Sequence, residues 1–242
     1  MANFKITINN KSNSDRAFLL FQDMPIPSNL NQKNVFANIY QRSPTINGKG
    51  AAHTDFTMKQ QYYAIYGTSQ TTADGAIRVD TGDSVPAKLG PNGTLAVVTT
   101  VDHNGTDPTW DQSQMANTAQ AKGGFDLRAD NTFKFPNPNE IYIGCGAQDP
   151  KTGEVIPIQT WLAQPGVTSQ IFPRVIYYIA FGNFEPGVVV DRNTIGQVLK
   201  VDFSGAAIPN ATFTLTNNGT YVPDDKVESN GVHWSFGNID GV

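Results

Sequence analysis

The chain has 242 residues, enough for one large β domain or two small ones. Charged residues make up only 16% of it, against about 25% in an ordinary soluble domain, and the net charge is −4. This balance excludes the strongly basic surface that nucleic-acid binding requires, so we expect no nucleic-acid partner. No run of about 18 apolar residues occurs, which excludes a membrane-spanning helix.

Asn, Gln, Ser and Thr take the place of the missing charge, together with 22 glycines and 15 prolines. This mixture is typical of short strands joined by tight turns, and it disfavours long helices, whose exposed faces carry Glu, Lys and Arg. Alternating apolar and polar residues, or runs of β-branched and aromatic residues, predict the strands. In chain order they lie at residues 4–8, 17–21, 35–40, 56–66, 76–80, 95–101, 133–135, 141–145, 155–161, 175–181, 188–190, 198–203, 211–216 and 232–236.

Two stretches of the chain recur at nearly one spacing. Tyr62–Gly67 (YYAIYG) is followed by Tyr177–Gly182 (YYIAFG), a shift of 177 − 62 = 115 positions. Downstream, Val97–Thr106 is matched by Ala211–Thr220, a shift of 211 − 97 = 114 positions. Two matches at such similar spacing predict that one β unit of about half the chain is present twice.

The predicted first β half is residues 1–110 and the second is residues 131–242, with a polar linker or long loop at residues 111–130 between them. Each half would hold about six strands, a common number for a sheet. The sequence therefore predicts an all-β fold with little helix. We expect one β-sandwich, or two, built from two quasi-equivalent halves by internal duplication.

Catalytic chemistry has little support in the sequence. Cys145 is the single cysteine, so no intrachain disulfide forms, which fits a reducing compartment. Its glycine neighbours leave room for a nucleophile, but no histidine is close in sequence, and a buried structural thiol is the better interpretation. No nucleotide-binding, serine-hydrolase or zinc-protease motif occurs, so we expect no catalytic residue, no cofactor and no enzyme activity.

Two oxygen-rich segments have the composition of a Ca²⁺ site. The first contains Asp102, Asn104 and Asp107, and the second spans residues 224–230. Neither follows the twelve-residue calcium-loop pattern, and Asp and Asn also cap turns through their own backbone. The three histidines lack the spacing of metal ligands, so we expect no metal site.

The remaining candidates for function are aromatic and amide side chains near turns. An aromatic ring stacks on the C–H face of a sugar, while amides and carboxylates bond its hydroxyl groups. Core packing explains each tryptophan taken singly, yet the set suggests a lectin-like module that binds neutral glycans or another uncharged ligand. Its candidate ligand-binding residues are Trp110, Trp161, Trp234, Asn104, Asp107 and Gln159. Assembly into a homo-oligomer would add avidity to weak sites.

Two other functions are compatible with the sequence. A pore-forming toxin or defence protein would act on a membrane surface and insert a hairpin, with residues 97–100 or 211–216 as its arms. A self-assembling structural protein would use low charge and abundant Asn and Gln for lateral packing. The N-terminus lacks the basic start and apolar run of a signal peptide, so we expect a cytoplasmic protein, or one released without classical secretion.

Overall fold

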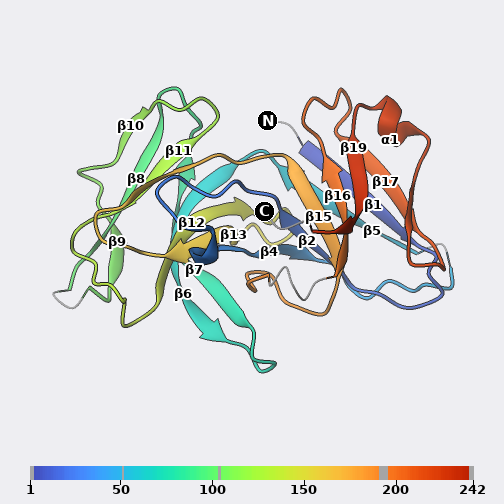
Figure 1. The fold of residues 1–242 in the computed structure, drawn as a ribbon, viewed down its shortest axis with the longest axis horizontal. Helices are drawn as coiled ribbons and strands as arrows, with labels where there is room; N and C mark the ends of the chain where they lie inside the picture. The colour runs from blue at the N-terminus through green and yellow to red at the C-terminus, as the bar shows by residue number, and fades with distance from the viewer. Residues whose placement is uncertain (1–2, 51, 103–104, 191–195, 240–242) are drawn as a thin grey trace.

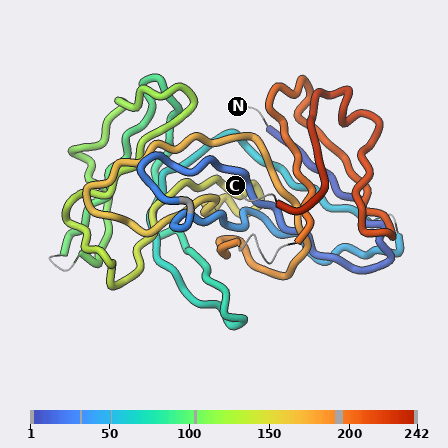
Figure 2. Tube along the Cα trace, viewed as in Figure 1, coloured from blue at the N-terminus to red at the C-terminus, as the bar shows by residue number. Residues whose placement is uncertain are grey.

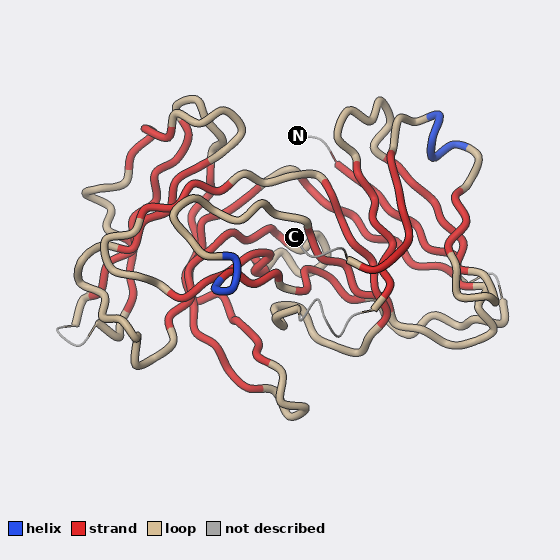
Figure 3. The backbone as a smooth tube through the Cα atoms, in the orientation of Figure 1, coloured by secondary structure: helices blue, strands red, loops and turns tan. Residues whose placement is uncertain are grey.

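The computed structural model describes residues 3–50, 52–102, 105–190 and 196–239, and regular structure in this part of the chain is almost entirely β (Figure 3). Helical structure is confined to a 3-10 turn, η1 (Gln32–Asn34), and one short helix, α1 (Lys226–Ser229). The predicted all-β class with little helix is confirmed. No helix among the described residues has the length and apolar character to cross a membrane.

The strands form two lobes that lie side by side (Figure 1). Lobe I takes its strands from both ends of the chain: β1 (Asn3–Asn10), β2 (Phe18–Gln22), β4 (Ile39–Arg42), β5 (His53–Lys59), β15 (Ile176–Phe181), β16 (Gln197–Asp202), β17 (Asn210–Leu215), β18 (Tyr221–Pro223) and β19 (His233–Asn238). Lobe II takes the middle: β3 (Val35–Ala37), β6 (Tyr62–Thr71), β7 (Ile77–Ala87), β8 (Gly93–Thr100), β9 (Pro108–Trp110), β10 (Ala116–Ala119), β11 (Phe125–Ala129), β12 (Ile141–Gln148), β13 (Val155–Leu162) and β14 (Thr168–Ile171).

Each lobe is a sandwich of two sheets. In lobe I the sheet β18-β17-β1-β5 packs on the sheet β19-β16-β15-β2-β4, and the rings of Phe4 and Tyr177 meet across the interface with centroids 6.4 Å apart. In lobe II the sheet β10-β8-β11-β14, with β9 on β8, packs on the sheet β3-β13-β12-β6-β7. There the rings of Tyr66 and Trp110 lie 5.1 Å apart. Aromatic side chains therefore close both sandwiches.

Strand β2 is buried along its whole length, as its continuous apolar sequence predicts. One of its faces points into the sandwich, where Leu20 joins the main core. On the other face Leu19 and Phe21 pack against Val188 and Val190. These two valines belong to residues 183–190, a segment that we call the strap because it runs over the outer face of this sheet. The strap therefore covers the outer face of β2, which the second sheet of the sandwich cannot contact because it packs on the opposite face.

Two pairs of neighbouring strands are parallel, and every other pairing between the described strands is antiparallel. Strand β1 runs parallel to β17, with Ile6 opposite Ala211, and β11 runs parallel to β8, with Leu127 opposite Ala96. Each parallel pair joins segments that are distant in sequence or separated by a long connection, as parallel pairing requires. In lobe I the pair joins the first strand of the chain to one of its last.

The strands of lobe II pair in the same pattern as those of lobe I. Strands from the first half of the chain in one lobe correspond to strands from the second half in the other. Strands β1, β2, β4 and β5 are paired as β11, β12, β13 and β14 are, and β15 to β18 are paired as β6 to β9 are. A bulge recurs at the same place: Tyr40 is the extra residue of β4 opposite β2, and Ile158 is the extra residue of β13 opposite β12. A glutamine follows each, Gln41 and Gln159. Internal duplication stays a prediction, and this correspondence is the pattern that it would leave.

The predicted boundaries between the halves differ from the observed sheets. The segment 111–130, predicted as a linker or long loop, contains β10 and β11, and β11 lies between β8 and β14. In β11 the alternation of buried and exposed residues is short, with only Phe125, Leu127 and Ala129 buried. The polar residues on either side of β11 hide this strand pattern in the sequence. The counterpart of β1 is therefore β11, and the predicted strand at residues 133–135 is a loop.

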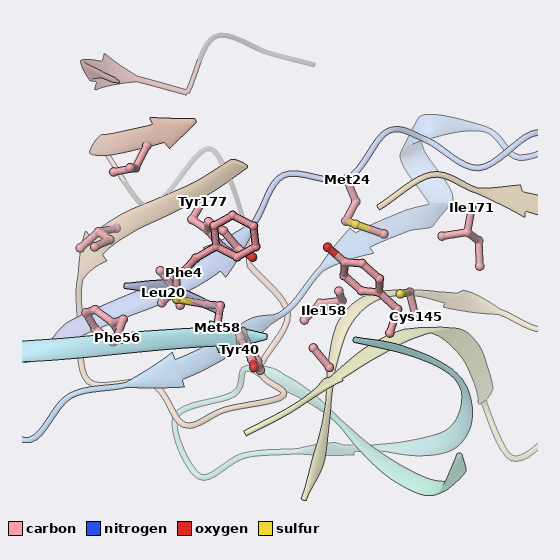
Figure 4. Packing of buried hydrophobic residues seen from close by; sticks show 14 of the residues in the cluster. Phe4, Leu20, Met24, Tyr40, Phe56, Met58, Cys145, Ile158, Ile171 and Tyr177 are labelled. Carbon is pink, nitrogen blue, oxygen red and sulfur yellow. The ribbon is translucent and has the colours of Figure 1, made fainter. Parts of the chain in front are cut away.

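The two lobes share one continuous core. The chain crosses between them at residues 23–34, at Asn38 between β3 and β4, and at residues 60–61 and 172–175. Figure 2 shows the backbone running between the lobes. At the junction, Gln22 of β2 is the cross-strand partner of Tyr177, and its Nε2 donates to the Tyr62 hydroxyl of lobe II at 3.2 Å. Figure 4 shows Tyr40 and Tyr177 in the same apolar cluster as Cys145. The lobes are therefore one folding unit.

We predict that neither half of the chain folds alone. A cut in the exposed turn after Gln112 gives fragments 1–112 and 113–242, and each of the four sheets then contains strands from both fragments. Each fragment alone should show no cooperative thermal transition by circular dichroism, whereas the two refolded together should recover the spectrum of the intact chain. A cooperative transition in either isolated fragment would contradict the exchanged arrangement.

We also predict that Gly67→Ala destabilises the fold. Gly67 lies opposite a bulge in β7, and a Cβ atom placed there would be 1.9 Å from the carbonyl oxygen of Asp80. Relieving this overlap requires the two backbones to separate, and overpacking of this kind costs about 1–3 kcal/mol of unfolding free energy. Gly237→Ala is the matched control, because a Cβ there meets no atom within 4 Å. Equal urea midpoints for the two variants would refute the argument.

Candidate functional site

Two of the three tryptophans predicted to stack on a ligand lie in the core. Trp161 is 1% exposed and Trp110 is 7% exposed, so neither ring offers a face to solvent. Trp161 lies in β13, an inner strand of its sheet, and Trp110 packs on Tyr66. Neither ring is therefore placed in this structure to stack on a ligand, although the sequence had led us to expect that role. Their place in lobe II is that of large core side chains.

The other predicted residues do not converge on one site either. Trp234 packs edge-on against Phe213 in lobe I, and its Nε1 donates to Glu228 Oε1 at 3.4 Å. Gln159 is buried and donates to the Pro25 carbonyl at 3.0 Å, which fixes a crossing segment between the lobes. The backbone N–H of Asp107 donates to Asp102 Oδ1 within a turn. Asn104 lies outside the described residues.

The buried ionisable groups have the properties of core residues. Cys145 is fully buried, and burial raises the pKa of its thiol far above the usual range, so the nucleophilic thiolate is disfavoured. This agrees with the interpretation of Cys145 as a structural thiol. No group of three or more His, Cys, Asp or Glu side chains in the described part of the chain is placed to hold a metal ion.

A pocket of about 460 Å³ lies beside α1 on the outer face of β17, in lobe I. We call it the helix-side pocket. Its lining residues come from β17, from the segment before it and from the turn around α1: Ile208, Asn210, Thr212, Asp224, Lys226, Val227 and Asn230. Figure 1 shows α1 at the outer end of lobe I, away from the junction.

Strand alternation sets the direction of the β17 side chains in this pocket. Ala211 and Phe213 belong to the core, so Asn210 and Thr212 point to the opposite face of the sheet. The backbone N–H of Asp224 donates to the Thr212 carbonyl at 2.9 Å, which places the turn before α1 against the strand. Asn230 Nδ2 donates to the Asn210 carbonyl at 3.2 Å and fixes the far side of the turn. The walls of the pocket are thus held by hydrogen bonds to the backbone carbonyls of β17.

The charges that line the helix-side pocket are balanced. Asp224 contributes a carboxylate and Lys226 an ammonium, while Asn210 and Thr212 contribute an amide and a hydroxyl. Ile208 is 50% exposed and gives the rim an aliphatic surface. Amides and hydroxyls both donate and accept hydrogen bonds, so the pocket is suited to a polar ligand without net charge.

Lobe II fills the equivalent place with apolar side chains. The strand that corresponds to β17 is β8, and the positions of Asn210 and Thr212 are taken there by Leu95 and Val97. The hydrogen bond from Asp224 to Thr212 has its counterpart from the Asp111 N–H to the Val97 carbonyl, also 2.9 Å. Val97 is fully buried, and β10 pairs with β8 at Leu95. The fold itself therefore does not require an open, polar pocket at this position.

Part of this pocket has a signal in the sequence. Asp224 and Asn230 lie in the oxygen-rich segment that composition marks as a possible ion site, although the structure places them in a pocket with Lys226. Asn210 and Thr212 have a weaker signal. They are polar where the aligned stretch of the first repeat, at a shift of 115, has Leu95 and Val97. That comparison depends on the strand register. The observed strands β8 and β17 correspond at a shift of 115, whereas the sequence match of Val97–Thr106 with Ala211–Thr220 is at a shift of 114.

The fold and the pocket define an all-β protein of two sandwich lobes, with a polar pocket on the outer face of lobe I. Comparison with protein families matches residues 1–225 to the RhiA family, and the chain belongs to that family. No curated protein and no solved structure matches the chain.

We predict that the protein loses stability above about pH 10, the ordinary pKa of tyrosine. Burial raises the pKa values of Tyr40, Tyr62, Tyr177 and Tyr221. Since the folded pKa is the higher one, this stability is fully present below the unfolded pKa and falls as pH rises through it. The unfolding free energy should fall by about 1.4 kcal/mol per buried tyrosine for each pH unit. Urea titrations at several pH values measure it.

Tyr221→Phe provides the control for this pH dependence. The Tyr221 hydroxyl is buried and has no hydrogen-bond partner among the described residues, so its removal should change stability near pH 7 by less than about 1 kcal/mol. The alkaline loss should become smaller, because one of the four groups is gone. Tyrosinate absorbance that develops before unfolding would contradict the burial of these hydroxyls.

Proposed function

We propose that this protein is a non-enzymatic binding protein that recognises neutral glycans, or similarly uncharged polyhydroxylated ligands, in the helix-side pocket. The observation that carries the proposal is the contrast between equivalent places in the two lobes. Lobe I keeps a hydrogen-bonding pocket where lobe II has two apolar residues, the half-buried Leu95 and the buried Val97. A polar hollow that the fold does not require is a candidate for recognition.

The chemistry of the lining supports a neutral ligand. The amide of Asn210, the hydroxyl of Thr212 and the charged pair of Asp224 and Lys226 offer donors and acceptors for sugar hydroxyls. The exposed side chain of Ile208 offers aliphatic contact to C–H groups, in place of the tryptophan rings expected from the sequence. A volume of about 460 Å³ is within the usual range for small-ligand sites, about 300–1,000 Å³.

Insertion into membranes has less support from the geometry. The two segments that the sequence offers as hairpin arms lie in β8 and β17, which are inner strands of their sheets. Releasing either one would break a parallel pair, β8 with β11 or β17 with β1. Membrane activity and self-assembly remain predictions from composition, and recognition of a ligand is the function that a specific feature of the structure favours.

We predict that Asn210→Leu with Thr212→Val weakens glycan binding while the fold is retained. The double variant gives β17 the outward residues that β8 has at the same positions, Leu95 and Val97. Each lost hydrogen bond costs about 0.5–1.5 kcal/mol, so affinity should fall about tenfold or more. A glycan array followed by calorimetry with the best neutral oligosaccharide measures the change.

The matched control is Thr214→Val. Thr214 lies two residues further along the same face of β17 and outside the pocket lining, so it should bind as the wild type does. Circular dichroism of both variants checks the fold. A wild-type protein that binds no neutral glycan would overturn the proposal, and so would a double variant that binds as tightly as the control.

A further inference from the structure

The helix-side pocket borders a polar face of lobe I. Strands β17, β1 and β5 lie side by side in that order, and β17 carries the pocket residues Asn210 and Thr212 (Figure 1). Core residues of β1 alternate with Lys5 and Thr7, so these two side chains point to the same outer face. In the register of the parallel pair, Lys5 lies next to Asn210 and Thr7 lies next to Thr212. The polar lining of the pocket therefore continues onto β1.

Strand β5 extends this polar surface by one more strand. Asp55 is the cross-strand partner of Thr7, and the Thr7 hydroxyl donates to Asp55 Oδ1 at 2.6 Å. Lys5 Nζ lies 2.9 Å from Asp55 Oδ2. We call Thr212, Thr7 and Asp55, with Lys5 beside them, the polar row. It begins in the helix-side pocket and crosses three strands.

The charges in the polar row compensate each other. Lys5 and Asp55 form an ion pair, and their side chains are still 46% and 39% exposed. An ammonium has three donors and a carboxylate accepts at both oxygens, so the pair keeps capacity for further hydrogen bonds. The hydroxyls of Thr7 and Thr212 both donate and accept. The row therefore suits a ligand that carries many hydroxyl groups and no net charge.

In lobe II a long side chain closes the corresponding passage. Arg128 of β11 takes the place of Thr7, and Val97 of β8 takes the place of Thr212. Arg128 Nη2 donates to Gln114 Oε1, and Gln114 belongs to the turn that is bonded to the far edge of β8. Because β8 lies between this turn and β11, the Arg128 side chain must cross β8 at Val97. Val97 is fully buried as a result.

Lobe I leaves this passage open. Thr7 has a short side chain, and its hydroxyl is bonded to Asp55 on the side away from β17. It does not reach across β17 as Arg128 reaches across β8. Both Thr7 and Thr212 are consequently half-buried rather than sealed. A ligand seated in the helix-side pocket can extend over β17 and β1 without displacing any part of this face.

We propose that the ligand of the helix-side pocket is an extended neutral oligosaccharide, which continues along the polar row to the pair of Lys5 and Asp55. This inference rests on the proposed function and adds the length and the course of the ligand. Neighbouring strands are about 4.8 Å apart, so the row offers hydrogen-bonding groups at short, regular steps. A chain of linked sugars likewise presents hydroxyl groups at regular intervals and carries no charge. The pocket holds one end of the chain, and the row holds the following sugars.

The test is isothermal titration calorimetry of the full chain with four neutral probe series. They are β-1,4-linked oligosaccharides of glucose, mannose, galactose and N-acetylglucosamine, each of one to six units. In a series that binds, affinity should rise at least tenfold from the monosaccharide to the tetrasaccharide, because hydrogen bonds on the row add to those in the pocket. Thr7→Arg places on β1 the residue that closes lobe II, and it should lower tetrasaccharide affinity about tenfold. Thr7→Val, which only removes the hydroxyl, should lower it severalfold.

Asn9→Arg is the matched control. Asn9 lies two residues further along the same face of β1, next to Thr214 and away from the pocket lining. It adds the same size and charge outside the polar row, so it should bind the tetrasaccharide as the wild type does. Circular dichroism of all variants checks the fold.

The outcomes separate this inference from the proposed function. Equal affinity for the monosaccharide and the tetrasaccharide would overturn the inference and leave the proposed function standing. An equal loss of tetrasaccharide affinity in Asn9→Arg and Thr7→Arg would also overturn it, because the effect would then come from added charge anywhere on the face. Absence of binding at every length in all four series would overturn the inference and the proposed function together.

Discussion

The parallel pairing of β1 with β17 and of β8 with β11 is the constraint on which the rest of the structure depends. Each pair places a strand from one half of the chain inside a sheet of the other half. Neither lobe can close its sandwich from one half alone, so the two lobes must form together. The shared core follows from this exchange, and Gln22 of β2 bonds Tyr62 of β6 where the two lobes meet. Asn38, fully buried between β3 and β4, serves the same junction: it accepts from the Thr160 hydroxyl at 2.9 Å and donates to the Gly187 carbonyl at 3.0 Å.

Two surface hollows have different origins in this arrangement. The helix-side pocket lies where the equivalent lobes differ, because β17 presents Asn210 and Thr212 where β8 presents apolar residues. A second hollow, between β7, the start of β13 and the strap, arises from a feature added to one lobe only, the strap that leaves lobe I and closes against β7. In lobe I the strand corresponding to β7 is β16, and its edge is covered by β19 instead. The sheets that correspond between the lobes form the core, while the hollows lie where the two lobes differ.

Strand alternation and turn composition predicted the all-β class and placed most strands, including the two tyrosine strands β6 and β15. The register of these strands agrees with a shift of 115, and Tyr62 and Tyr177 both point into the core. Sequence reasoning missed β11, because five residues among polar neighbours carry too little periodicity. It also did not anticipate the burial of Trp110 and Trp161, which sit in turn-rich sequence but are enclosed by long-range packing. Which face of β17 is open depends on how α1 lies against it, and no local pattern contains that information.

The N-terminal strand must wait for its neighbour during synthesis. Ile6 pairs with Ala211, and the ribosome adds the 211 − 6 = 205 residues between them before that pairing can form. At roughly 5–20 residues per second this takes about 10–40 s. During that interval β1 has its antiparallel partner β5 but a bare parallel edge, the kind of surface that recruits strands from other chains. Nascent copies are therefore most vulnerable to cross-pairing until β17 (Asn210–Leu215) emerges, and translation speed and chaperone supply should govern the yield of the native protein.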